Sequence, residues 1–450
     1  RVCVHNRVGR VEVTSDDELD RWLVLRVGGP HPQISLFERT APRSWRANFK
    51  LCRAGRYTIH VRAMMAQQPW LEWSANWTAH ATRPPCAGPW YAGALLPQHI
   101  IEHDGAASTT SCAGGLWSWP DSNEYRSAAG TMLEQITPAP HPNRTSLQTL
   151  FGSLRFTEPS PRRAASAALT QPPTPPANNA ASSLIICVVG DSQMRTLADG
   201  IVQHLVESGK GGCSCSVPKK PLAACPKNPT GAQTCKRIVC AGSTQNVSVH
   251  YFRASYGNEL ATQLPFTGRP TLTEHLGRQC SVALFNSGQW WASWKKKPKP
   301  PHTALAPGEY ATHVEALMAQ LKTIRVPVAW VATNPYPINA GGPDYTWSRA
   351  RPYDMSACPP GERRFLHVLQ AYNRHAKRLA AVHGLDFVDT WQIALPLFDV
   401  SADGAHYAWL ASPVGKPQAA RAIRWALRAA VEARQPPVST AACLRSAWES

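Results

Sequence analysis

The chain has 450 residues, of which 43% are hydrophobic, and a formal net charge of +18 at pH 7. This length predicts two or three domains, and the composition allows a sizeable apolar core. No apolar run approaches the ~20 residues of a membrane-spanning helix. A first residue other than Met (Arg1) is compatible with removal of a signal peptide or an N-terminal anchor.

The positive charge is mostly scattered arginine, and the one dense run lies at 295–299. Three explanations are open: a solvated basic surface, contact with an acidic glycan or anionic wall polymer, or binding of nucleic acid. No nucleic-acid-binding module occurs in the sequence. We therefore expect no nucleic acid as partner. A solvated basic surface is the favoured explanation, followed by contact with an acidic glycan or polysaccharide.

Residues 1–80 have the pattern of an all-β region. The runs 21–27 and 57–63 are short and rich in β-branched and aromatic residues, with partial alternation. Gly55 lies in a turn that leads into the second run. These features predict an immunoglobulin-like β-sandwich. The alternative is a β-rich extension of the main domain that has no core of its own.

The next two segments have weak periodicity. Residues 81–156 are rich in Cys, Trp and Gly, which predicts an irregular layer packed on a neighbouring domain. Residues 157–183 are rich in Pro and Ala, which is typical of a linker.

From residue 184 onward, apolar strand patterns alternate with helical ones. The expected strands are 184–189, 247–253, 281–286, 326–333 and 385–389. The expected helices are one that follows Ser192 and ends before Gly209, then 308–324, 363–383 and 415–433. This alternation predicts one α/β domain over 184–450, doubly wound, with a mostly parallel sheet and flanking helices.

Thirteen cysteines occur, and five of them lie between 213 and 240 in a stretch rich in Gly, Pro and Lys. We expect disulfides here, because a loop that cannot pack a core is often held by them in an oxidising compartment. A zinc site is the alternative, although Cys213 and Cys215 lack the usual ligand spacing. The odd count leaves one free thiol, which we expect to be Cys187 in the buried strand.

Gly190-Asp191-Ser192 is the most informative motif, because it joins a buried strand to an amphipathic helix. A serine on such a turn exposes its hydroxyl at the carboxyl edge of the sheet. It needs a base that is held in orientation. His406 is the candidate base, and Asp403, three residues earlier, is the candidate partner for its other ring nitrogen.

An acyl-transfer intermediate also needs donors for its oxyanion. We expect these to be the Ser192 N–H, the Asn286 side chain and the Gly288 backbone. Aromatic rings beside such an edge suit the C–H faces of sugars, so Trp290, Trp291 and Trp294 are candidate substrate contacts.

Together, Gly190-Asp191-Ser192, Asn286 and Asp403-x-x-His406 resemble the SGNH (GDSL-like) hydrolase superfamily. The segment 285–291 is similar to the Asn-x-Gly-x-Trp-Trp motif of its PC-esterase branch, which contains trichome-birefringence-like polysaccharide O-acetyltransferases. The resemblance covers roughly 184–430. It implies an SGNH-like fold, a catalytic triad of Ser192, His406 and Asp403, and an acyl-serine intermediate. It further implies O-acetyl transfer to or from a carbohydrate hydroxyl, with no bound cofactor.

Transferase and esterase need the same triad; the resemblance favours a polysaccharide O-acetyltransferase, and leaves the acetyl donor open. Three sequons, Asn76, Asn143 and Asn246, agree with N-glycosylation. With the cysteines, they predict the secretory pathway, in the Golgi lumen or outside the cell.

Two other functions remain as alternatives. His99-Ile100-Ile101-Glu102-His103 matches the zinc motif H-x-x-E-H, which requires a helix. Pro97 and Gly105 leave little room for one, so we expect a polar surface strand or turn and no metal. The other alternative is a non-catalytic glycan-binding or matrix protein.

Overall fold

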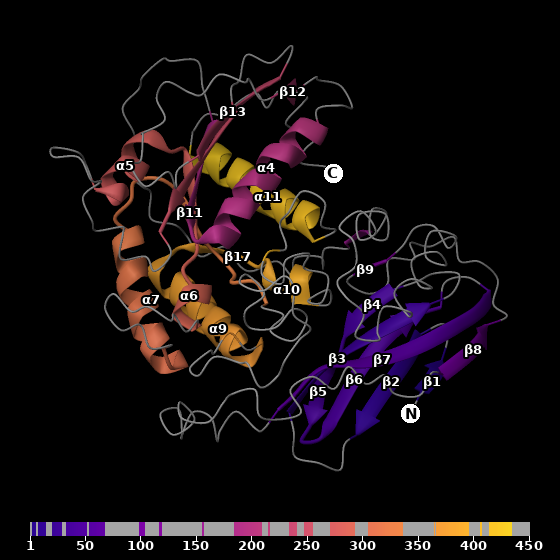
Figure 1. The fold of residues 1–450 in the computed structure, drawn as a ribbon. Helices are drawn as coiled ribbons and strands as arrows, with labels where there is room; N and C mark the ends of the chain where they lie inside the picture. Colours follow the sequence, from indigo (N-terminus) through magenta and orange to yellow (C-terminus); the bar gives the residue numbers. More distant parts are fainter. Residues whose placement is uncertain are drawn as a thin grey trace, which may run out of the picture.

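The computed structural model of the chain describes residues 2–5, 8–14, 20–28, 33–51, 54–67, 99–103, 117–118, 155–156, 184–208, 215–216, 234–240, 247–254, 271–292, 305–335, 364, 366–395, 406 and 414–433. These residues form two antiparallel sheets near the N-terminus and a mixed sheet with helices on both faces (Figure 1).

The mixed sheet has seven strands, and its inner part is parallel. In spatial order the strands are β12 (Cys215–Ser216), β13 (Thr234–Cys240), β14 (Val247–Arg253), β11 (Leu184–Gly190), β15 (Val282–Phe285), β16 (Val328–Val331) and β17 (Asp386–Val388). The five strands from β14 to β17 pair in parallel, while β13 and β12 add an antiparallel edge. The earliest strand, β11, is therefore central, with the chain winding outward to both sides.

Successive side chains of β11 point to opposite faces of the sheet and belong to two separate apolar layers. Leu184, Ile186 and Val188 face a layer that contains α4 (Ser192–Ser208) and α11 (Gly415–Ala433). Cys187 and Val189 face the other layer, with α5 (Leu272–Gln279), α6 (Gln289–Ala292), α7 (Pro307–Leu321), α9 (Leu366–His383) and α10 (Trp391–Ala394). Both faces of this strand are buried, as expected for a parallel sheet between helices (Figure 1). The predicted α/β fold with a mostly parallel sheet and flanking helices is confirmed.

The N-terminal strands form two antiparallel sheets that share one apolar core. The first sheet has the order β1 (Val2–His5), β2 (Val8–Thr14), β6 (Ser44–Lys50) and β5 (Glu38–Ala41). The second has the order β10 (Arg155–Phe156), β9 (Trp117–Ser118), β4 (Gln33–Leu36), β3 (Asp20–Gly28), β7 (Gly55–Gln67) and β8 (His99–His103). Trp45 and Phe49 of β6 pack in one cluster with Leu25 of β3 and Tyr57 of β7. The β-rich character is confirmed; immunoglobulin-type connectivity stays a prediction.

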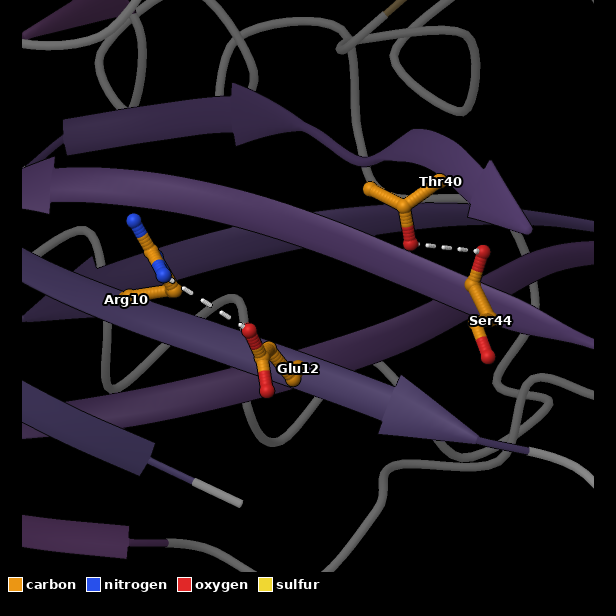
Figure 2. Close-up of polar contacts among 4 residues, drawn as sticks. All are labelled: Arg10, Glu12, Thr40 and Ser44. Carbon is orange, nitrogen blue, oxygen red and sulfur yellow. Dashed lines mark hydrogen bonds and ion pairs between the residues drawn. The ribbon is translucent and has the colours of Figure 1, made fainter.

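The outer side of the first sheet is polar. Arg10 and Glu12, two residues apart on β2, form an exposed ion pair with a distance of 3.8 Å between Nη1 and Oε1; the pair is drawn in Figure 2. The Thr40 hydroxyl lies 3.4 Å from the Ser44 carbonyl oxygen across the turn from β5 to β6. Exposed pairs of this kind contribute little to stability, so this side acts as a solvated surface.

Cys187 is not the free thiol that we expected. It forms a disulfide with Cys280, which follows α5, over a sequence separation of 93 residues. The burial of the strand that suggested a free thiol instead places Cys187 against a second buried cysteine. Pairing among the five cysteines between 213 and 240 stays a prediction, although Cys215 and Cys240 are register partners between β12 and β13.

Some expected features lie outside the described residues: the sequons Asn76, Asn143 and Asn246, the linker 157–183 and the basic run 295–299. In the part of the chain that is described, no helix combines the length and apolar character needed to cross a bilayer.

Candidate active site

The candidate nucleophile lies where the strand order reverses. The chain proceeds from β11 to β14 on one side and from β15 through β17 on the other, and ligands of open α/β sheets bind at such a switch point, beyond the carboxyl ends of the strands. Asp191 and Ser192 follow β11 here, and Asn286 follows the adjacent β15.

Gly190 shapes the turn. Its φ is +153°, and a Cβ atom there would lie 2.6 Å from the Asn286 carbonyl oxygen. The Asn286 N–H donates to the Val189 carbonyl at 3.1 Å, and the Tyr251 hydroxyl donates to the Asp191 carbonyl at 2.9 Å. Only glycine fits between these contacts, so the turn brings the serine close to the end of β15.

Ser192 and His406 meet in the structure. His406 Nε2 lies 2.8 Å from Ser192 Oγ, although the two residues are 214 positions apart. Both side chains are half-buried. This is the nucleophile–base distance that proton transfer requires. Asp403, the expected partner of the other imidazole nitrogen, lies outside the described residues, so its role stays a prediction.

Two of the three expected oxyanion donors are available. Ser192 is the first residue of α4, and Gly288 lies in the buried turn between β15 and α6. Among the described residues, none accepts a hydrogen bond from the Ser192 N–H or the Gly288 N–H. Two such backbone N–H groups at the carboxyl edge could stabilise a developing negative charge.

Asn286 is held differently from our expectation. Its side-chain Nδ2 donates to the Val331 carbonyl at 2.7 Å and to Thr333 Oγ1 at 3.0 Å. Both amide hydrogens are therefore used in tying the end of β15 to the end of β16. In this arrangement Asn286 supports the turn and has no hydrogen left for an oxyanion.

The three tryptophans have different environments. Trp291 is buried; its Nε1 donates to Ser287 Oγ at 3.2 Å, and its ring packs on His313 with centroids 4.2 Å apart. A ring enclosed in this way is unavailable for stacking on a sugar, which corrects the expectation for Trp291. Trp290 is half-buried, and Trp294 lies outside the described residues.

A buried polar network beside the serine was missed by the sequence analysis. The Asn334 N–H donates to the side chain of Gln193 at 3.3 Å, and Gln418 Nε2 donates to Asn334 Oδ1 at 2.7 Å. Asn373 exchanges two hydrogen bonds with the backbone of Thr333. A signal was available: Thr333 and Asn334 are polar residues that come one residue after the end of buried strand β16, much as Asp191 and Asn286 follow β11 and β15.

Burial raises the pKa of the Asp191 carboxyl, an effect that the Gln193 N–H and the charge of His406 oppose. Burial also raises the pKa of Tyr310 far above its ordinary value, and the charge of Asp191 raises it further. The Tyr310 hydroxyl stays protonated and donates to the Ser287 carbonyl at 3.1 Å.

The H-x-x-E-H segment forms strand β8, which confirms the expected strand. Residues 99 and 103 then share one side of the sheet and residue 102 takes the other, so the motif lacks the helical spacing of a zinc site. The described residues contain no group of three or more His, Cys, Asp or Glu that could hold a metal ion.

No protein-family model matches the chain, and no curated protein matches it. Among solved structures, a putative GDSL-like lipase from Parabacteroides merdae is similar at 12% identity and a TM-score of 0.30, over 56% of this chain and 96% of that one. An α/β hydrolase from the metagenome of Lake Arreo matches at 14% and 0.28, over 54% and 95%. A variant of an acetyl-xylooligosaccharide esterase from Geobacillus matches at 14% and 0.29, over 55% and 94%.

Proposed function

We propose that this protein transfers acyl groups from esters through an acyl-enzyme formed on Ser192, with His406 as general base. The observation that carries the proposal is the 2.8 Å contact between Ser192 Oγ and His406 Nε2 at the switch point of the sheet. A hydroxyl and an imidazole from distant segments meet where this fold places ligands. Within the described part of the chain, no group accepts a hydrogen bond from the N–H of Ser192 or Gly288, which leaves two donors for the oxyanion of acyl transfer.

The chemistry follows from these atoms. His406 Nε2 takes the proton of the Ser192 hydroxyl as Oγ bonds to the ester carbonyl carbon, and the carbonyl electron pair moves onto its oxygen. The tetrahedral species then expels the alcohol, which takes the proton from Nε2, and leaves acyl-serine. A second hydroxyl, from water or a sugar, gives its proton to Nε2 as its oxygen bonds to the acyl carbon. The second tetrahedral species then expels Ser192 Oγ, which takes the proton back from Nε2, so that both side chains return to their starting state. Asp403 would hold the imidazole in orientation.

The finer proposal is O-acetyl transfer to or from a carbohydrate, within the SGNH superfamily and its PC-esterase branch. It is supported by the motif residues 285–291 and by Trp290, which is half-buried and lies four residues after Asn286 in the chain. A polysaccharide O-acetyltransferase is favoured, and a carbohydrate O-acetylesterase is the alternative. The buried disulfide supports an oxidising compartment, the secretory pathway or the cell exterior.

The test incubates wild type and Ser192→Ala with an activated acetyl ester, with and without candidate oligosaccharides. Serine-dependent formation of acetyl-sugar supports the transferase, and serine-dependent acetate release that sugar does not change supports the esterase. Ser44→Ala, on the N-terminal sheet, is the matched control and is expected to retain full activity. Turnover that survives in Ser192→Ala would contradict the proposal, and a complete lack of turnover would favour a non-catalytic glycan-binding protein.

A further inference from the structure

Asp191, the residue before the nucleophile, caps helix α4. Its Oδ1 accepts the Gln193 N–H at 2.8 Å, the Met194 N–H also bonds to this carboxyl, and the Arg195 N–H donates to the Asp191 carbonyl at 3.1 Å. The first turn of a helix has N–H groups without partners inside the helix. Asp191 engages those that follow Ser192, so that, as far as the described residues show, the Ser192 N–H is the one left for a ligand.

A cap alone does not explain an aspartate here. Ser, Thr or Asn caps a helix equally well and carries no charge, whereas Asp191 is only 1% exposed. Its second oxygen, Oδ2, is buried and has no hydrogen-bond partner among the described residues. A buried carboxylate oxygen without a donor is costly, and burial accordingly raises the pKa of Asp191. The chain thus keeps an ionisable group where a neutral one would be more stable.

The charged and titratable groups around Asp191 come from several elements. They are His406, Arg364 just before α9, Tyr310 of α7 and Tyr251 of β14. The charges of His406 and Arg364 favour the ionised carboxylate. In the proposed reaction only His406 changes its charge, because it takes the proton of Ser192. The interaction between Asp191 and His406 is therefore stronger after that proton transfer than before it.

We propose that Asp191 is a positioning residue for acyl transfer, which frees the Ser192 N–H for the oxyanion and stabilises the cationic ring of His406. This inference rests on the proposed function of Ser192 and His406. Asp191 thus places a negative charge on the turn that carries Ser192. This charge acts on His406 in addition to the carboxylate expected at Asp403.

Asp191→Asn separates the charge from the cap, because the Asn side-chain oxygen still accepts the Gln193 N–H. We expect the melting temperature at neutral pH to rise, since a buried charge is removed. We expect kcat to fall roughly tenfold with KM unchanged, and the acid limb of the pH–rate profile to move to lower pH, because the variant lacks the negative charge that favours the cationic ring. Higher stability with lower activity is a combination that a purely structural residue would not produce.

Two variants serve as controls. Glu315→Gln removes one exposed carboxylate from α7 and is expected to leave both the rate and the pH profile unchanged. Thr271→Ala removes the side-chain cap of α5, which accepts the Glu274 N–H at 3.2 Å. It should lower the melting temperature with kcat retained. If Asp191→Asn does not fold, Asp191→Ser provides the same neutral cap.

The titration of the His406 ring, followed by NMR in wild type and Asp191→Asn, makes this test independent of turnover. A lower midpoint in Asp191→Asn supports the electrostatic part of the inference, that Asp191 stabilises the cationic His406 ring, whichever result Ser192→Ala gives for the proposed function. An unchanged midpoint, or an unchanged kcat and acid limb in an enzyme that depends on Ser192, would overturn it.

Discussion

At the scale of single residues, the site depends on small groups that fit closely together. Gly288 is one of them: a Cβ atom there would lie 1.8 Å from Thr333 Oγ1. Thr333 in turn accepts a hydrogen from Asn286, whose amide joins two strand ends. The backbone N–H of Gly288 is thus placed by contacts that reach across β15 and β16.

Gly288→Ala should disturb this arrangement. Because the added methyl group would overlap Thr333, we expect about 1–3 kcal/mol of destabilisation and a lower kcat. Urea unfolding and steady-state kinetics measure the two effects. Gly308→Ala is the control, since a Cβ atom at Gly308 meets nothing within 4 Å. Equal stability of the two variants would show that Thr333 can move away at no cost.

His250 makes stability depend on pH. Burial, and then the charge of His275, lowers the pKa of His250 to about 4. In the unfolded chain the His250 imidazole has its ordinary pKa of ~6.5. Between about pH 4 and this value, the unfolded state therefore holds more protons than the folded state. Stability is therefore lost as the pH falls from about 6.5 to about 4, by up to roughly 3 kcal/mol.

His250→Leu should reduce this loss. Urea unfolding at about pH 7 and about pH 4.5 measures the change in unfolding free energy for wild type and variant. We expect a smaller change in the variant. The same change in both would show that other groups control the acid sensitivity.

Among the site residues, Ser192 and His406 could be predicted because each lies at the end of a recognisable pattern. The roles of Asn286 and Trp291 could not. Whether an amide donates to a ligand or to a neighbouring carbonyl, and whether a ring is enclosed, depends on packing partners such as Val331 and His313, which are remote in sequence.

At the scale of elements, the central strand β11 positions the site and is fixed to its surroundings covalently. The disulfide from Cys187 to Cys280 joins the middle of this strand to the residue that follows α5. Both cysteines are buried, at 0% and 8% exposure. The bond therefore restrains the segment between β11 and β15 without contacting solvent.

Replacement of both cysteines by Ala should cost about 4–5 kcal/mol, because the bond closes a loop of this length. Urea unfolding without reductant measures the loss. Mild reductant added to the folded wild type should leave the disulfide intact, since the sulfur atoms are covered. A stability loss below about 1 kcal/mol in the double variant would contradict this account.

The parallel strands and long helices were predictable because their apolar periodicity is clear: the helix 415–433 has the expected bounds. Strand β13 and helix α5 were missed. The first lies in a cysteine-rich stretch at the antiparallel edge, and the second has only two buried residues, Leu272 and Leu276. An element with so short an apolar stripe is specified by tertiary contacts.

At the scale of the whole molecule, the winding of the chain brings the site together. Because β11 is central and the later strands add outward, the segments that follow β11, β15 and β16, which begin at residues 191, 286 and 332, all start at one edge of the sheet. The order of the strands along the sequence does not reveal which strands are neighbours in the sheet. The register Val189–Phe285–Trp330 shows it, and places these strand ends side by side.

If Ser192 is the nucleophile, it becomes acylated during turnover, and mass spectrometry detects the acyl group. Wild type is mixed with an activated acetyl ester, quenched in acid during the first turnovers and digested. We expect one acetyl group on the peptide that contains Ser192, removed by later incubation with the acceptor and absent in Ser192→Ala. Acetylation of a different residue together with unchanged turnover in Ser192→Ala would contradict it.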